Sequence, residues 1–484
     1  MKPTIEQQNI IDSAKAGNNL AIKAYAGAAK TSTCIMVANE VVKNSLYISF
    51  NKDIATEAGS KFPSHVTCQT IHSLAYREII KFPKSPMGQR LKGSLNINDI
   101  LKLASFNEIT AEFKEDDAFN YALIVKDTIT AFCQSSSADV EKFTHQYLIS
   151  EEENFINDIA EIATSYWEAL TKGDSFTISH DIYLKMFQLS KPMLKNKDTG
   201  VYEVIYLDEA QDSNPVTLDI FLNQDQAQKI IVGDPFQAIY AWRGAVDAFS
   251  HVTDDFKQLT LSESFRYTQT IADQSASIIN WFGGNNSITG RGEISKYNKN
   301  AASYAYLCRN NSSVLRLLLE AAEKRQYVYC NINLQELFSK LYHLAAILFN
   351  QVPKYPVAEL KQYTTKAQLL KAAEKDQELA TMIRLVDVLN AGKGMFQNIK
   401  DIKQYATEDK NIAVYSVTTV HKSKGLEWDM VILNDDLIPK IREDQDFSQW
   451  VDENPQEVNL LYVAVTRAKY EVIASDELTY YIGV

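Results

Sequence analysis

The residues best suited to chemistry stand at the end of a short run of small side chains. Residues 24–31 read AYAGAAKT. This run is close to the pattern G-x-x-x-x-G-K-[ST], in which the lysine reaches terminal phosphates and the hydroxyl binds Mg²⁺. Lys30 and Thr31 fit those two positions, whereas Ala24 and Ala29 replace the two glycines. The octapeptide alone leaves a nucleotide site and an ordinary strand–helix turn equally open.

The flanking sequence favours the nucleotide site. Upstream, Asn19–Ala24 is short and largely apolar and follows a Gly-Asn turn signal, which predicts a buried strand. Downstream, residues 31–44 carry apolar side chains at helical spacing. A strand, a tight loop of small residues and a helix together aim backbone N–H groups and the positive end of the helix at phosphates.

Two adjacent acids follow a second apolar run. Residues 202–207 are largely apolar and lead into the sequence DEAQD, which begins with Asp208 and Glu209. In phosphate-loop enzymes, the first acid at the end of a buried strand holds Mg²⁺ and the second orients or deprotonates the attacking water. The alternative is a strand that ends in a solvated acidic turn. The presence of Lys30 and Thr31 elsewhere in the chain makes the catalytic interpretation the better one.

A third segment combines a phosphate sensor with flat aromatic faces. Residues 233–245 read GDPFQAIYAWRGA and follow another predicted buried strand. Gln237 can hydrogen-bond to a terminal phosphate, Tyr240 and Trp242 can stack on bases, and Arg243 adds positive charge. Packing in the core is the alternative for the two aromatic residues. Their place in a polar, glycine-flanked loop favours binding.

Composition and charge restrict the class of protein. The 484 residues are 45% hydrophobic and 23% charged, which is typical of a globular chain with about two to four domains. No run of 18 apolar residues and no apolar leader is present, so we expect a soluble intracellular protein without a membrane span, which would lie in the cytoplasm or nucleoid if its source is bacterial or viral. The five cysteines form no C-x-x-C pair, which argues against a zinc site. The net charge of −12 argues against a protein that coats nucleic acid, but a motor needs only local basic and aromatic contacts.

The order of these segments resembles that of superfamily 1 helicases of the UvrD/Rep type, and most of all the helicase core of the F-box DNA helicases. The resemblance extends over nearly the whole chain. In order, the similar segments are residues 4–8, 24–31, 47–52, 70–75, 208–212, 233–245, 264–266, 419–427 and 461–469. Because the first of them begins at Thr4, we expect no F-box in this chain.

The resemblance implies a role for each matching residue. The implied catalytic residues are Lys30, Glu209, Gln237, Arg266 and Arg467, the last as an arginine finger. The implied contacts to ATP are Gln7, Gly27, Ala28, Ala29, Lys30, Thr31, Phe265, Gly425 and Glu427, and the implied Mg²⁺ ligands are Thr31 and Asp208. The implied DNA contacts are Phe50, Asn51, Thr70, His72, Tyr240, Trp242, Arg243 and His421. For the two histidines, a structural role is the alternative.

The resemblance also implies an α/β fold with two RecA-like phosphate-loop NTPase lobes, each a parallel sheet flanked by helices, and two mainly helical inserted subdomains. The implied boundaries are 1–76 and 200–262 for the first lobe, 77–199 for its helical insert, 263–334 and 411–484 for the second lobe, and 335–410 for a small helical insert. Helical spacing at residues 124–134, 155–172, 334–350 and 367–390 agrees with the two inserts.

The implied activity is that of an ATP-driven, Mg²⁺-dependent translocase and helicase that moves 3′ to 5′ on single-stranded DNA. We expect a monomer that binds single strands and single-strand/duplex junctions in replication, recombination or repair. Two alternatives stay open. The methyl group of Ala29 crowds the phosphate loop, which favours an ATP-binding clamp or interaction module that hydrolyses weakly. The small insert at 335–410 favours a translocase that displaces bound proteins and unwinds duplex poorly.

Overall fold

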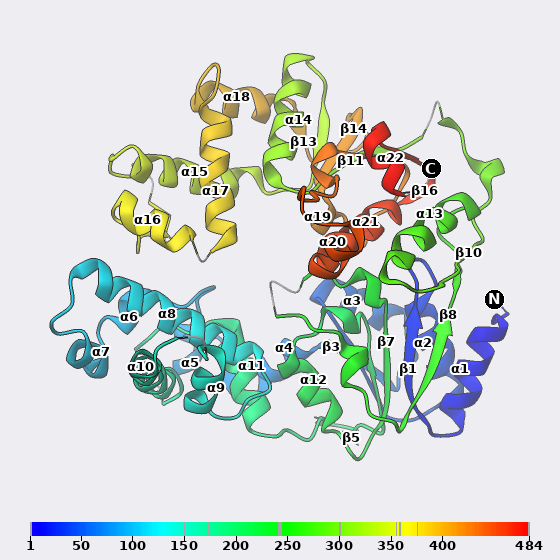
Figure 1. The fold of residues 1–484 in the computed structure, drawn as a ribbon. Coiled ribbons are helices and arrows are strands. Elements are labelled where there is room, and N and C mark those ends of the chain that lie inside the picture. The colour runs from blue at the N-terminus through cyan, green and yellow to red at the C-terminus, as the bar shows by residue number, and fades with distance from the viewer. Residues whose placement is uncertain are drawn as a thin grey trace. The chain divides into compact units, whose positions relative to one another are not determined.

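The computed structural model forms two compact units (Figure 1). It describes residues 2–149, 151–172, 175–240, 244–299, 302–354, 356–357, 360–374 and 376–482. The first unit holds the described residues up to 23, from 30 to 235 and from 240 to 261. The second unit holds residues 24–29, 236–239 and the described residues from 262 onward. The implied boundaries of four subdomains stay a prediction.

A six-stranded sheet forms the centre of the first unit. Its strands, in spatial order, are β3 (Val66–Thr70), β2 (Ser45–Ser49), β6 (Val204–Leu207), β7 (Gln228–Gly233), β1 (Asn19–Ala24) and β8 (Phe256–Leu261). The first five pair in parallel from β3 to β1. Every residue of β2 and β6 is buried, as expected for parallel strands covered on both faces. The parallel strands bring their carboxyl ends, where ligands bind in open α/β sheets, to one edge.

The helices beside this sheet begin at recognisable caps. They are α1 (Ile5–Lys15), α2 (Lys30–Glu40), α3 (Lys52–Lys61), α4 (Ile71–Ala75) and α12 (Pro215–Leu222). Thr4 and Gln7 form a capping box at the start of α1, and Asn51 caps α3. Helix α2 ends four residues before the predicted end at residue 44. The chain there turns toward β2, and the Asn44 amide donates to the Val201 carbonyl at 2.9 Å.

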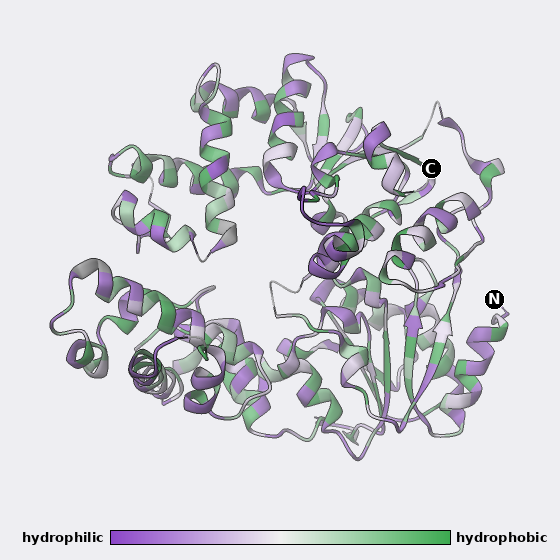
Figure 2. Cartoon of the chain, in the orientation of Figure 1, coloured by the Kyte–Doolittle hydropathy of each residue, from purple (hydrophilic) through white to green (hydrophobic). Residues whose placement is uncertain are grey.

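Helices make up most of the insert in the first unit. They are α5 (Pro86–Arg90), α6 (Ile97–Ile100), α7 (Ala104–Ile109), α8 (Glu115–Gln134), α9 (Val140–Tyr147), α10 (Glu153–Thr171) and α11 (His180–Leu189). Apolar and polar residues alternate along these helices (Figure 2). The predicted helical stretches at 124–134 and 155–172 lie in α8 and α10. A π-helical turn, Tyr76–Ile80, leads into the insert, and β4 (Lys195–Asn196) and β5 (Gly200–Val201) lead out of it.

A second six-stranded sheet forms the centre of the second unit. In spatial order its strands are β13 (Ala406–Thr407), β12 (Val328–Cys330), β14 (Tyr415–Thr419), β11 (Tyr304–Cys308), β15 (Trp428–Leu433) and β16 (Ala468–Ile473). All five pairs are parallel. The helices around it are α13 (Gln269–Ile279), α14 (Asn311–Glu323), α19 (Val420–Ser423), α20 (Phe447–Glu453), α21 (Pro455–Val465) and α22 (Asp476–Ile482). The short strands β9 (Glu263–Ser264) and β10 (Thr289–Gly290) pair separately.

The insert of the second unit consists of α15 (Leu334–Leu348), α16 (Lys366–Ala373), α17 (Gln377–Asn390) and α18 (Met395–Tyr405). The helical pattern at 367–390 is divided between α16 and α17, because Asp376 caps a new helix by accepting from the Leu379 N–H. Two parallel sheets flanked by helices, with helical insertions, confirm the predicted α/β class. Among the described helices, none combines the length and apolar character needed to span a bilayer.

Candidate active site

Four of the predicted catalytic and metal-binding residues lie together at the carboxyl edge of the first sheet. Lys30 and Thr31 open α2, while Asp208 and Glu209 follow β6. The Lys30 Nζ atom is 3.4 Å from Oε1 of Glu209. The Thr31 hydroxyl donates to Oδ2 of Asp208 at 2.9 Å. Residues 177 positions apart in the sequence therefore form one polar centre.

The Asp208 carboxylate is buried and held by three donors. The Asp208 residue is 3% exposed. Oδ2 accepts from Thr31 and from the Tyr47 hydroxyl, and Oδ1 accepts from the Glu209 N–H at 2.8 Å. Burial, and then the nearby charge of Glu209, raise the pKa of Asp208, while the positive charge of Lys30 opposes them. A cation placed at this carboxylate would favour its charged form.

The residues present fit a divalent cation. Mg²⁺ prefers oxygen ligands and is commonly held by one or two carboxylates together with substrate phosphates. Thr31 and Asp208 supply a hydroxyl and a carboxylate oxygen 2.9 Å apart. A cation held by these two groups would supply positive charge for phosphate oxygens.

Glu209 is fixed by its backbone and by Gln211. Its φ of 51° lies in the left-handed region, which is uncommon for a residue other than glycine. The fully buried Gln211 donates from Nε2 to Oε2 of Glu209 at 2.6 Å and accepts from the Asp234 N–H at 3.0 Å. A Cβ at Gly233 would approach Oε1 of Gln211 to 2.5 Å, so any side chain there would displace the Gln211 amide. Gln211 thereby joins Glu209 to the end of β7.

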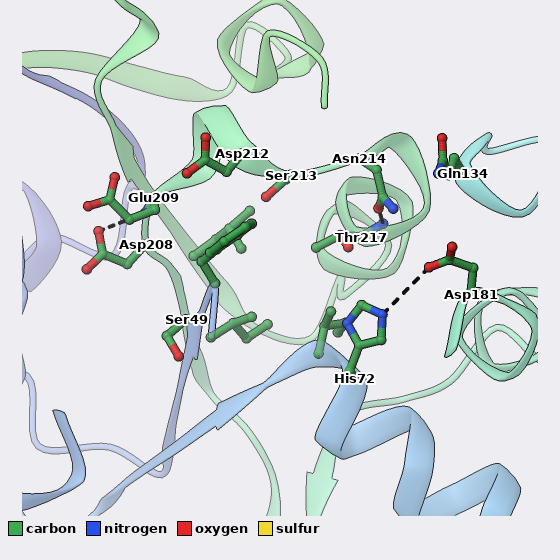
Figure 3. Close-up of a pocket in the computed structure, with 14 residues that line it drawn as sticks. Ser49, His72, Gln134, Asp181, Asp208, Glu209, Asp212, Ser213, Asn214 and Thr217 are labelled. Atoms are coloured by element: carbon green, nitrogen blue, oxygen red, sulfur yellow. Dashed lines mark hydrogen bonds and ion pairs between the residues drawn. The ribbon is translucent and has the colours of Figure 1, made fainter. Parts of the chain in front are cut away.

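The two acids line a cavity of about 370 Å³ in the first unit, and predicted DNA contacts line it too (Figure 3). Phe50 and His72 contribute to its wall, as do Gln134 at the end of α8 and Asp181 of α11. Figure 3 shows His72 directed toward Asp181, and their Nε2 and Oδ1 atoms are 4.0 Å apart. One cavity thus extends from the two predicted catalytic and metal-binding carboxylates to side chains predicted to contact DNA.

An aromatic pair lies next to this cavity. The rings of Phe50 and Tyr240 stack with centroids 5.8 Å apart and an interplanar angle of 12°. Phe50 is 43% exposed, so part of its side chain is open to solvent, and aromatic side chains in such positions can stack on bases. The predicted contacts Asn51 and Thr70 cap α3 and α4, respectively. Trp242 and Arg243, the other predicted contacts in this segment, lie outside the described residues.

The predicted arginines of the second unit are engaged by neighbours within that unit. The buried Arg467 donates to the Val463 carbonyl at 3.0 Å and to Oε1 of Gln237 at 3.3 Å. Arg266 donates to Oε2 of Glu427 at 3.1 Å. Lys469 pairs with the same carboxylate at 3.0 Å. Although burial acts to raise it, the hydrogen bond from Lys469 and the charges of Lys469 and Arg266 lower the pKa of Glu427.

The loop at 24–29 packs against this part of the second unit. The Gly27 carbonyl accepts from the Phe265 N–H at 3.0 Å, and the Ala26 N–H donates to the Tyr462 hydroxyl at 3.0 Å. Gly27 has a φ of 76°, and a Cβ there would lie 2.7 Å from that of Arg266. Ala29 has a φ of 57°, so the alanine in the second glycine slot adopts a left-handed conformation. Such a conformation strains a residue with a Cβ by about 1–2 kcal/mol.

The remaining predicted contacts are found in both units. Gln7 is buried and donates to the Thr33 hydroxyl at 3.1 Å, next to the start of α2. His421 lies in the short helix α19, and Gly425 follows that helix with a φ of 85°. Phe265 is 42% exposed, which leaves a ring face available, and Ala28 is buried.

Comparison with protein families assigns the chain. The model of the UvrD/REP helicase N-terminal domain matches residues 4–257, which is more than half of the chain, and that of the UvrD-like helicase C-terminal domain matches residues 415–474. The chain belongs to the UvrD/REP helicase family. This confirms the resemblance noted from the motifs.

Two relatives of this helicase cover almost all of it. F-box DNA helicase 1 of Gallus gallus is 31% identical over 541 residues, with 100% of this chain and 50% of the relative covered. F-box DNA helicase protein 1 of Schizosaccharomyces pombe is 28% identical, with 98% of this chain and 58% of the relative covered. The helicase chain therefore spans about half the length of these relatives. A solved structure of two Pif1 helicases at forked double-stranded DNA has 13% identity and a TM-score of 0.38, covering 100% of this chain and 94% of that one.

Sequence reasoning did not identify several residues of the candidate site. Tyr47 and Gln211 donate hydrogen bonds to Asp208 and Glu209, respectively, and Gln134 and Asp181 line the cavity. Tyr47 lies on a strand, where an aromatic residue is expected in the core. Gln134 and Asp181 belong to the helical insert, whose position beside the cavity depends on the tertiary fold. For Tyr47 and Gln211 a signal was present, because they lie within the segments 47–52 and DEAQD, respectively.

Proposed function

We propose that this helicase-family chain is an ATP-dependent translocase and helicase on single-stranded DNA that moves 3′ to 5′. One observation carries the nucleotide part of the proposal, namely the contacts of Lys30 with Glu209 and of Thr31 with Asp208. Family membership supports the motor class. The polarity and the role in DNA replication, recombination or repair come from the resemblance.

The chemistry proposed for the site is phosphoryl transfer to water. Lys30 would neutralise charge on the terminal phosphates, Asp208 and Thr31 would hold Mg²⁺, and Glu209 would orient and deprotonate the attacking water. The short hydrogen bond from Gln211 keeps the Glu209 carboxylate in one orientation. Gln237, Arg266 and Arg467 keep their predicted roles at the γ-phosphate as part of this proposal.

The proposed path of the DNA strand passes the Phe50–Tyr240 stack. Base stacking on an aromatic side chain contributes about 1–3 kcal/mol by alanine substitution and tolerates any sequence. Such tolerance suits a motor that must step along every sequence. The cavity lined by Glu209 and His72 lies beside Phe50, which supports a link between strand binding and hydrolysis. We propose that a monomer binds single strands and single-strand/duplex junctions.

Strand displacement tests the proposed activity and its polarity together. We expect ATP- and Mg²⁺-dependent displacement from a duplex with a 3′ single-stranded tail and little from the same duplex with a 5′ tail. Lys30→Ala should abolish displacement on both. Displacement only with the 5′ tail would contradict the polarity. A chain that moves 3′ to 5′ on single strands and removes a bound protein, without separating duplex, would support protein displacement as its main output.

A second candidate function is an ATP-binding clamp that hydrolyses slowly. The left-handed conformation of Ala29 favours it, because strain in the phosphate loop opposes close approach to phosphate. The clamp would bind single-stranded DNA more tightly with ATP but turn over ATP at a rate that DNA does not change. The retention of Lys30, Asp208 and Glu209 in one centre favours the motor.

A further inference from the structure

Tyr47 occupies an unusual position for a core tyrosine. It lies on β2, is 0% exposed, and its hydroxyl donates to Oδ2 of Asp208. Its ring packs on Phe62, with centroids 4.6 Å apart. Packing places the ring, and the hydroxyl reaches a carboxylate that the sequence predicts as a metal ligand.

The neighbouring strand provides an internal comparison. Tyr206 on β6 is paired in register with Tyr47 and is also 0% exposed. Its ring contacts the same Phe62, at 6.3 Å. Its hydroxyl has no hydrogen-bond partner among the described residues. Two adjacent buried tyrosines therefore share a packing environment, and the Asp208 contact distinguishes them.

The three groups that donate to Asp208 differ in whether their residues have another predicted role in the site. Thr31 is itself a predicted metal ligand, and the Glu209 N–H belongs to the backbone of a catalytic residue. The Tyr47 hydroxyl also donates to Asp208, but Tyr47 has no predicted catalytic, ATP-binding or metal-binding role of its own. We propose that Tyr47 is a positioning residue that orients the Asp208 carboxylate to bind the divalent cation. The inference rests on the proposed nucleotide site.

The physical reason is the behaviour of ligands that are themselves hydrogen-bonded. A partner that holds a metal ligand fixes the direction of its lone pairs, and its removal typically lowers metal affinity 10- to 100-fold. In a buried site, water is poorly placed to replace a lost donor. Removing the Tyr47 hydroxyl should therefore weaken metal binding more than it disturbs packing.

The experiment measures Mn²⁺ binding to the full chain with ADP, by electron paramagnetic resonance, without turnover. Tyr47→Phe removes the hydroxyl and keeps the ring, and Tyr206→Phe is the matched control. We expect the Kd of Mn²⁺ to rise about ten-fold in Tyr47→Phe and to stay unchanged in Tyr206→Phe. The affinity for ADP in EDTA should be the same in all three proteins. Tyr47→Met, a second variant that lacks the donor and has a long flexible side chain to fill the space of the ring, should show the same loss if Tyr47→Phe is poorly folded.

Each outcome decides the inference. Unchanged Mn²⁺ affinity in a folded Tyr47→Phe protein would overturn it and leave the proposed nucleotide site intact. An equal loss in Tyr206→Phe would also overturn it, because packing would then explain both. Unmutated protein that binds no Mn²⁺ with ADP would overturn the nucleotide site and this inference together.

Discussion

Gln211 donates a 2.6 Å hydrogen bond to the carboxylate of Glu209, and its own amide oxygen accepts from the backbone of Asp234. Through Gln211, the proposed general base Glu209 is linked to Asp234, which directly follows the neighbouring strand β7. Gln211→Ala should lower the ATP turnover number about ten- to a hundred-fold, since small displacements of a catalytic group have effects of this size. The KM for ATP should change little. Steady-state kinetics measure both quantities.

Gln226→Ala is the control for this prediction, because Gln226 is an exposed glutamine between the same two strands. It should leave turnover unchanged. A Gln211→Ala protein with normal turnover and a raised KM would contradict the positioning of Glu209 and would indicate a role in ATP binding.

Ala29→Gly tests how the alanine in the second glycine position affects stability and ATP hydrolysis. Its φ of 57° means that Ala29→Gly should relieve about 1–2 kcal/mol of strain, partly offset by the greater freedom of glycine in the unfolded chain. We expect a small rise in the free energy of unfolding and an ATPase rate that is raised or unchanged. Ala28→Gly, at a residue without a positive φ, should instead destabilise by about 0.4–1 kcal/mol. A large loss of ATPase in Ala29→Gly would show that the alanine form of the loop is a working variant.

The aromatic stack makes a prediction about strand binding. Phe50→Ala should weaken binding of single-stranded DNA by about 1–3 kcal/mol, because one face of the Phe50–Tyr240 pair is lost as a stacking platform. Basal ATP hydrolysis without DNA should stay close to that of the unmutated chain. Fluorescence anisotropy with a labelled oligothymidine measures the affinity. Phe396→Ala removes an exposed ring from α18 and should have no effect, and equal losses in both variants would argue against a specific stack.

Because Lys185 is buried, we expect its contribution to the free energy of unfolding to depend on pH. It is 0% exposed, donates to the Ser135 carbonyl at 2.9 Å, and lies 4.3 Å from the Phe132 ring centroid. Burial lowers the pKa of Lys185 to about 8. Between about pH 8 and pH 10.5 the unfolded chain then binds more protons at this residue than the folded chain, so its contribution to stability rises with pH.

The comparison variant is Lys185→Met, which has no charge to titrate. The unfolding free energy of the unmutated protein, minus that of Lys185→Met, should increase from pH 8 to pH 10 in denaturant titrations. A difference that falls over this interval would show that the carbonyls and the ring raise the pKa of Lys185 instead of lowering it.

The sequence predicted the site best where the functional residues directly follow a predicted strand. Lys30 and Thr31 come after a strand and a loop of small residues, and Asp208 and Glu209 come after an apolar run. Their positions along the sequence were therefore sufficient to predict that they lie at one edge of the sheet. Tyr47 could not be found in this way, because its partner is set by the pairing of β2 with β6. The division of residues 367–390 into two helices depends on one cap, Asp376, which competes with a continuous apolar pattern.

The positions beside the cavity were beyond sequence reasoning for a different reason. Asp181 approaches His72, and Gln134 lines the same cavity. The two residues lie at the ends of separate helices in the insert, and helix packing determines where those ends lie. The sequence showed that the methyl group of Ala29 crowds the phosphate loop, but the left-handed φ of Ala29 could be known only from the folded loop.

The most direct measurement is the rate of ATP hydrolysis with and without single-stranded DNA, in the unmutated chain and in Glu209→Gln. We predict strong stimulation by DNA in the unmutated chain. Glu209→Gln should lose about a hundred-fold or more of that rate, as expected for a general base, while still binding ATP. Hydrolysis that single-stranded DNA does not stimulate in the unmutated chain would contradict the motor and favour the clamp.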